Sequence, residues 1–136
     1  MKLVAGLGCR AGCPPDELQR LLLQCLAEAG ASLDELVALA SSEAKAAEPG
    51  LMALAAWLGL TLYGLPVDSL AAQAGRLSQP SARVLALTGS AGIAEAAALA
   101  QAEALFGGPV RLHIDKRRSA SATCALACIA HEAERP

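Results

Sequence analysis

The stretch that decides the fold is Gly6-Leu7-Gly8-Cys9-Arg10-Ala11-Gly12-Cys13-Pro14. The apolar run of residues 3–5 predicts a buried first β-strand, which we expect over residues 1–8, and a periodic helical pattern begins near Pro15. In open α/β sheets, ligands bind at such loops, between the carboxyl end of a strand and the amino end of a helix. The stretch therefore predicts an α/β domain whose first loop is a candidate binding site.

The same loop has the composition of an anion site. Its glycines let the backbone approach a ligand without obstruction from a Cβ atom, and these are Gly6, Gly8 and Gly12. Backbone N–H groups and the cation Arg10 would then face an anion. The alternative is a tight turn between strand and helix in which the glycines serve geometry alone, and spacing does not decide between the two.

Composition limits the classes of partner. A length of 136 residues suits one domain, which we expect to span residues 1–130, with residues 131–136 as a tail. Hydrophobic residues make up 54% of the chain and aromatic residues only 2%, so the core is expected to be aliphatic. The net charge of −2 and the absence of a long basic run argue against nucleic acid as a partner. A small anion remains possible because it needs only a few local cations.

Cysteine content and hydropathy bear on the compartment. Five cysteines in a chain without a signal peptide indicate reduced thiols, and hence a cytoplasmic protein. The uncharged segment from Pro49 to Val67 approaches the length of a membrane span. However, Gly59, Gly64 and Pro66 interrupt its second half. A helix followed by a short strand fits this segment better, so we expect no membrane insertion.

Periodicity along the chain predicts alternating helices and strands. Apolar residues at helical spacing predict a helix over residues 15–29, ended by Gly30, and the continuous apolar run 36–40 predicts a second strand. The later predictions are helices over 50–58, 66–70 and 93–106, strands over 61–63, 84–87, 110–115 and 122–130, and a basic turn at 116–118. This order implies a three-layer α/β/α sandwich on a mainly parallel mixed sheet of about five or six strands, with an antiparallel closing pair at one edge.

Three polar loops are expected to share one rim of the sheet. They span residues 6–14, 41–48 and 88–92, and each follows a predicted strand. The carboxyl ends of parallel strands meet at one edge, so these loops would lie together. The second and third loops contribute Ser41, Ser42, Lys45, Glu48, Thr88, Gly89 and Ser90.

Other chemistries fit the residues less well. The spacing of Gly6, Gly8 and Ala11 loosely matches a dinucleotide fingerprint, but Pro14 and Pro15 delay the helix, and no acidic residue ends the second strand. The lack of a Gly-Lys-Ser/Thr sequence excludes a P-loop. Paired cysteines four positions apart, Cys9 with Cys13 and Cys124 with Cys128, permit a metal knuckle. The second pair lies in an apolar run, where thiols behave as hydrophobic side chains, so we expect neither a metal nor a cofactor.

Catalytic groups are sparse. Glu95 lies near the start of the helix over 93–106, where it is either an acid/base group or a favourable charge at the positive end of the helix dipole. The candidate hydroxyls lack an evident His partner, and these are Ser41, Ser42, Ser90 and Thr123. The residues alone therefore predict an α/β domain with a polar rim that binds an anionic small molecule.

Four blocks in order resemble one family. Gly6–Gly12 resembles the G-[IL]-G-C-R-x-G opening of the cobalamin-biosynthesis family that comprises CobE and the C-terminal domain of CbiG. Ala40–Leu51 is similar to its second block, in which a Lys and a Glu three residues apart precede Gly-Leu, with Ser41 where the family usually has Thr. Gly89–Leu99 resembles the third block, G-x-x-x-[VI]-A-E-A-A-A-L. Lys116 and the strand Thr123–Ala127 complete the match.

The resemblance implies a role in forming the corrin ring of cobalamin (vitamin B12). CbiG-type proteins open a lactone and release a two-carbon fragment from a cobalt-precorrin, but their additional N-terminal regions are absent from these 136 residues. We therefore expect a free-standing CobE-like protein that binds or carries a precorrin or corrinoid in the oxygen-dependent pathway. The alternatives are a hydrolase-like enzyme acting on a precorrin, and a non-catalytic partner of another cobalamin-pathway enzyme.

The resemblance also implies a ligand site. Tetrapyrroles of this kind carry acetate and propionate carboxylates around a flat, partly apolar ring, which a rim of amides, hydroxyls and cations would suit. We expect Arg10, Lys45 and Lys116 to converge there, Glu48 to hold Lys45, and Glu95 to exchange a proton if chemistry occurs. The full expected set is Gly6, Gly8, Cys9, Arg10, Gly12, Ser41, Ser42, Lys45, Glu48, Thr88, Gly89, Ser90, Glu95 and Lys116.

Overall fold

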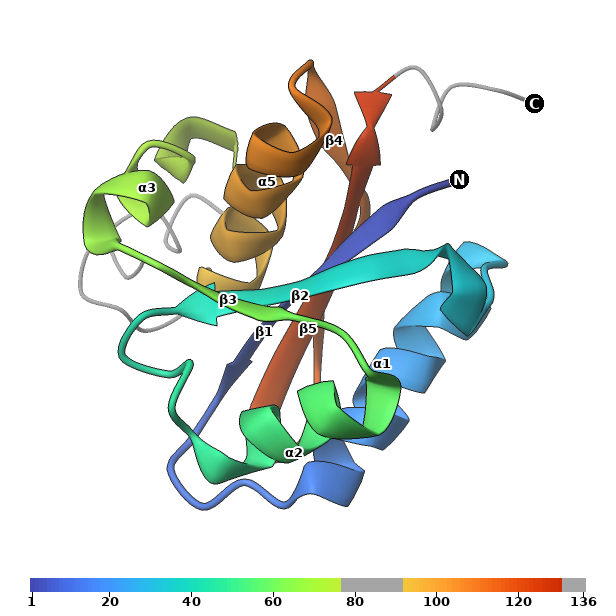
Figure 1. Ribbon diagram of the computed structural model, residues 1–136, viewed down its shortest axis with the longest axis vertical. Coiled ribbons are helices and arrows are strands. Elements are labelled where there is room, and N and C mark those ends of the chain that lie inside the picture. Colours follow the sequence, from blue (N-terminus) through green and yellow to red (C-terminus); the bar gives the residue numbers. More distant parts are fainter. Residues whose placement is uncertain (77–91, 131–136) are drawn as a thin grey trace.

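A five-stranded sheet lies between two layers of helices in the computed structural model, which describes residues 1–76 and 92–130 (Figure 1). The predicted three-layer α/β/α sandwich with a mixed sheet is confirmed. Thr88, Gly89, Ser90, the predicted strand over 84–87 and the expected tail 131–136 lie outside the described residues.

The sheet has the strand order β3-β2-β1-β5-β4. β1 (Leu3–Cys9), β2 (Leu36–Ser42) and β3 (Leu62–Leu65) are parallel. β5 (Ala122–Ile129) runs antiparallel to both β1 and β4 (Val110–Arg118). β4 therefore points in the same direction as β1, and the carboxyl ends of β1, β2 and β4 meet at one rim.

Helices of the described residues cover both faces of the sheet (Figure 1). α1 (Pro15–Ala29) and α2 (Pro49–Leu58) lie on one face, and α3 (Val67–Ala71) and α5 (Ile93–Phe106) lie on the other. Short 3-10 turns, η1 (Leu33–Glu35) and η2 (Ala74–Arg76), connect elements at the periphery.

α1 has the bounds that its apolar spacing predicts. Proline at its first position has a fixed φ that suits a helix start, and Gly30 ends the helix in a left-handed conformation with φ 68°. The buried stripe fills the core between α1 and the sheet, and it consists of Leu18, Leu21, Leu22, Cys25 and Leu26.

β1 spans Leu3–Cys9 and includes Gly6 and Gly8, so it closely matches the first strand expected over residues 1–8. The expected loop over residues 6–14 therefore begins at Arg10. A Cβ atom on Gly6 would lie 1.8 Å from the carbonyl oxygen of Ala94 in α5. Gly6 is therefore needed for the close packing of α5 on β1, an interaction between elements that sequence spacing does not report.

The expected basic turn at residues 116–118 is wrong, because these residues end β4. The turn itself spans Ser119–Ser121 and is closed by a hydrogen bond from the N–H of Ser119 to the carbonyl of Ala122, 2.9 Å long. Arg117 faces α1, where its side chain pairs with Glu28 at 3.0 Å. Its neighbours Lys116 and Arg118 line a cavity on the other side of the strand. Charged side chains are common on edge strands such as β4, because they oppose pairing with other chains.

Candidate functional site

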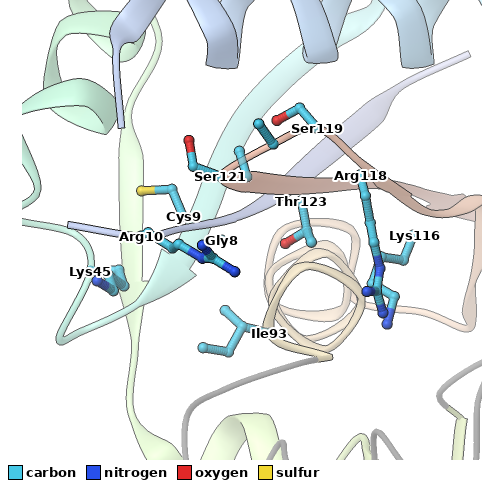
Figure 2. Close-up of a pocket in the computed structure, with 12 residues that line it drawn as sticks. Gly8, Cys9, Arg10, Lys45, Ile93, Lys116, Arg118, Ser119, Ser121 and Thr123 are labelled. Carbon is cyan, nitrogen blue, oxygen red and sulfur yellow. The ribbon is translucent and has the colours of Figure 1, made fainter. Parts of the chain in front are cut away.

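A cavity of about 520 Å³ opens at the rim where β1 and β4 end and α5 begins (Figure 2). We call it the rim cavity. The residues that line it are Gly8, Cys9, Arg10, Lys45, Ile93, Lys116, Arg118, Ser119, Ala120, Ser121, Ala122 and Thr123. Its volume is in the range of small-molecule sites.

Four cations from three segments border the rim cavity. Arg10 follows β1, Lys45 lies in the loop after β2, and Lys116 and Arg118 lie two residues apart on β4. Figure 2 shows Arg10 and Lys45 on one side, Lys116 and Arg118 on the other, and Ile93 between the two groups. The expected convergence of Arg10, Lys45 and Lys116 on one rim is thus present in the structure.

These cations have no acidic partner in the described part of the chain. Within residues 1–76 and 92–130, no carboxylate forms an ion pair with the side chain of Arg10, Lys45, Lys116 or Arg118. Other cations in the same residues do form ion pairs, for example Arg20 with Asp16 at 2.8 Å. Clustered like charges without counter-charges create a positive local potential that favours an anionic ligand.

The floor of the rim cavity is neutral. Gly8 lies opposite Thr123 in the β1–β5 pairing, and a Cβ atom on Gly8 would lie 2.9 Å from the Thr123 hydroxyl oxygen. Glycine at this position therefore leaves room above the strands. Ile93 adds an apolar surface at the first turn of α5, where the helix dipole places a partial positive charge.

Glu95 is buried beside the rim cavity and does not line it. Its side chain is 1% exposed, and Oε2 accepts the backbone N–H of Lys116 at 2.8 Å. The pairing of β4 with β5 shifts register between Ile114 and Arg117, so this carboxylate binds β4 where the ladder is irregular. The sequence left two roles open for Glu95, an acid/base group or a favourable charge at the helix dipole. The observed hydrogen bond supports a third, structural role, in which Glu95 holds the backbone that carries Lys116.

Cys9 lines the rim cavity, but its side chain packs against the core on the α1 face of the sheet, and its thiol is poorly suited to nucleophilic attack. Burial, followed by the proximity of Cys13 and Glu48, raises the pKa of Cys9 to about 11, against a smaller opposing effect of Lys45. The thiol is therefore protonated at neutral pH, and the thiolate is the reactive form. No group of three His, Cys, Asp or Glu side chains in the described part of the chain could hold a metal ion.

The remaining expected residues support the rim without lining the cavity. Ser42 Oγ accepts the N–H of Lys45 at 3.2 Å, whereas the buried Ser41 Oγ has no hydrogen-bond partner within residues 1–76 and 92–130. Gly12 adopts φ 81° and donates its N–H to Glu48 Oε1 at 2.7 Å. The expected ion pair between Glu48 and Lys45 is absent from the described residues, because Glu48 instead ties its loop to the loop after β1.

Sequence reasoning missed the contribution of the β4–β5 turn. Arg118, Ser119, Ser121 and Thr123 all line the rim cavity. The sequence did contain a signal for Arg118. If residues 116–118 form a strand, the side chains of Lys116 and Arg118 lie on the same face. Interpreting the three consecutive cations as a turn left this shared face unrecognised.

No helix in the described residues is both long enough and apolar enough to cross a membrane. The fold and the rim cavity define a small α/β domain with an uncompensated cationic site at the carboxyl rim of its sheet. The sequence model of the family described as Cobalamin synthesis G C-terminus matches residues 3–127, and the chain belongs to this family of cobalamin-biosynthesis proteins.

Two relatives support this assignment. The chain is 40% identical over 125 residues to Protein CobE of a Sinorhizobium species, covering 92% of this chain and 79% of that protein. It is 31% identical over 133 residues to Cobalt-precorrin-5A hydrolase of Priestia megaterium, covering 96% of this chain. This chain spans only 33% of the length of the hydrolase.

Solved structures agree with the fold. The crystal structure of CobE, a protein from the cobalamin (vitamin B12) biosynthetic pathway, superposes with a TM-score of 0.84 at 47% identity, covering 93% of this chain and 89% of that one. Cobalamin biosynthesis protein chiG from Agrobacterium tumefaciens has a TM-score of 0.70 at 28% identity, covering 94% and 98%. The resemblance found in the sequence is confirmed.

Proposed function

We propose that this cobalamin-biosynthesis protein binds a precorrin or corrinoid intermediate in the rim cavity and carries it between steps of the oxygen-dependent pathway. The observation that carries the proposal is the convergence of Arg10, Lys45, Lys116 and Arg118 on one cavity, all without acidic partners among the described residues. Family membership supplies the kind of ligand, since the intermediates of this pathway are tetrapyrroles with carboxylate side chains.

The shape of the site suits such a ligand. Two cations on each side of an apolar residue, Ile93, match carboxylates that project from opposite edges of a flat, partly apolar ring. Arg10 and Arg118 can each hold a carboxylate through two parallel N–H donors. Each such charge-assisted hydrogen bond contributes about 1.5–3 kcal/mol when water is excluded. Only the edge of a macrocycle with its side chains needs to enter the cavity.

Hydrolysis of a precorrin is the second candidate, and the relative named Cobalt-precorrin-5A hydrolase favours it. The described lining offers weak support for it. The Cys9 thiol is held protonated, and the Glu95 carboxylate is committed to the backbone of β4. We therefore favour binding and delivery, either alone or as a partner of another pathway enzyme. We place this role in the cytoplasm, in line with five cysteines that form no disulfide.

A titration separates these alternatives. The full chain is titrated into a corrinoid whose side chains are free carboxylic acids, and the visible absorption and binding heat are recorded. The proposal expects saturable binding with no change in the mass of the corrinoid after incubation. Unchanged spectra and no heat at high micromolar corrinoid would contradict binding. A mass change in a precorrin incubated with this chain alone would favour the hydrolase.

A further inference from the structure

We propose that Glu17, which lies outside the rim cavity, is a positioning residue for its cationic wall; this inference rests on the proposed function. Glu17 occupies the first turn of α1 and accepts three hydrogen bonds from the β4–β5 turn. Its Oε2 accepts the backbone N–H of Ser121 at 2.7 Å and also the hydroxyl of Ser119. Its Oε1 accepts the hydroxyl of Ser121, also at 2.7 Å.

The turn held by Glu17 connects two of the four cations. Ser119 follows Arg118 directly in the chain, so the turn sets where β4 ends. The carbonyl of Ser121 accepts the backbone N–H of Arg10 at 2.9 Å, which joins the same turn to the end of β1. Ser119 and Ser121 also line the rim cavity. A single carboxylate on α1 therefore fixes the backbone around both Arg10 and Arg118.

The contacts favour a carboxylate. Three donors reach two oxygens of Glu17, and the hydrogen bonds from Ser119 and Ser121 lower the pKa of this carboxyl. A glutamine side chain has one acceptor oxygen, and its NH2 group can pair with the Ser121 hydroxyl only if that hydroxyl accepts instead of donating. Glu17→Gln therefore keeps the size of the side chain while replacing charge-assisted hydrogen bonds with weaker neutral ones.

A neighbouring residue provides the matched control. Like Glu17, Glu28 belongs to α1. It pairs with Arg117 of β4 on the face of the strand that points away from the rim cavity. Glu28→Gln thus removes one acidic contact between α1 and β4 without touching the β4–β5 turn. A loss of affinity that comes only from weaker docking of α1 would occur in both variants.

The test measures the affinity of each variant for the free-acid corrinoid. We expect Glu17→Gln to weaken binding about five- to twentyfold with unchanged circular dichroism, and Glu28→Gln to bind like the wild type. In the Glu17→Gln background, Arg118→Gln should add less loss than it does alone, because the two residues act through one turn. Should Glu17→Gln not fold, the double variant Ser119→Ala, Ser121→Ala removes the two hydroxyl hydrogen bonds to Glu17 and leaves the one from the backbone N–H of Ser121.

The outcomes distinguish this inference from the function on which it rests. If the wild type does not bind the corrinoid, the proposed function fails. If the wild type binds and Glu17→Gln binds equally well, only the positioning role of Glu17 is overturned. Equal losses in Glu17→Gln and Glu28→Gln, or fully additive losses with Arg118→Gln, would also overturn it.

Discussion

The carboxylate of Glu95 accepts the backbone N–H of Lys116 across 2.8 Å and so joins the first turn of α5 to the end of β4. The carboxylate is buried, so no water replaces it if it is removed. Glu95→Ala should lower the free energy of unfolding by about 1–3 kcal/mol, because the N–H of Lys116 loses its acceptor. Denaturant unfolding measures this loss. Glu95→Gln is the control, since it retains one acceptor oxygen and should be less destabilising. Equal unfolding midpoints for the wild type and Glu95→Ala would contradict this role.

Arg10 should affect ligand affinity far more than stability. Its side chain is exposed and has no ion-pair partner among the described residues, so its loss breaks no ion pair there. Arg10→Ala should weaken binding of the free-acid corrinoid about ten- to a hundredfold while the thermal unfolding midpoint stays nearly constant. Arg20→Ala, at an exposed arginine that does not line the rim cavity, is the matched control and should leave affinity unchanged. Wild-type affinity in Arg10→Ala would move the ligand away from the rim cavity.

Glu17 should make stability depend on acid pH in a definite direction. Hydrogen bonds from the β4–β5 turn lower the pKa of its carboxyl below the ordinary value of 4.5. The folded state then binds fewer protons than the unfolded state, so the contribution of Glu17 is full above pH 4.5 and is lost as the pH falls through the lowered value. The stability difference between the wild type and Glu17→Gln should therefore shrink in acid. Urea unfolding at several pH values measures it, and a constant difference down to pH 3 would refute the linkage.

Ser41 should be dispensable for stability. Its buried hydroxyl has no hydrogen-bond partner among the residues that the structure describes, and such a group gains nothing from burial to offset its lost hydration. Ser41→Ala should leave the free energy of unfolding unchanged or raise it by up to about 1 kcal/mol. Corrinoid affinity should also persist, because Ser41 does not line the rim cavity. A marked loss of either quantity would show that the hydroxyl has a partner in solution.

The sequence was most informative where local signals define an element. Helices α1 and α5 have the predicted bounds because proline or glycine marks their ends, and in α1 apolar spacing also defines the buried face. The end of β4 was misjudged, because consecutive cations are typical of loops. Pairing with β5 makes Arg117 and Arg118 part of the strand. The pairing of β1 with β5 does not follow from local composition either, since the paired residues lie more than a hundred positions apart in the sequence.

The candidate site was likewise predictable only where strand direction places its residues. Strand direction alone brought Arg10 and Lys116 to one rim, because parallel strands end together. Predicting the place of Arg118 requires the correct end of β4. Predicting the contacts of Glu17 requires the position of a turn about a hundred residues away in sequence. Contacts between distant segments of this kind follow from tertiary packing, and no motif marks them.

The most direct test of carboxylate recognition compares two corrinoids that share one ring. One has free carboxylic acid side chains, and in the other these are converted to neutral carboxamides. A cavity bordered by four unpaired cations gains charge-assisted hydrogen bonds only from the acid form. Parallel titrations of the wild type at neutral pH should show the acid binding at least about tenfold more tightly than the amide. Equal affinity for the two forms, or tighter binding of the amide, would contradict carboxylate recognition at the rim cavity.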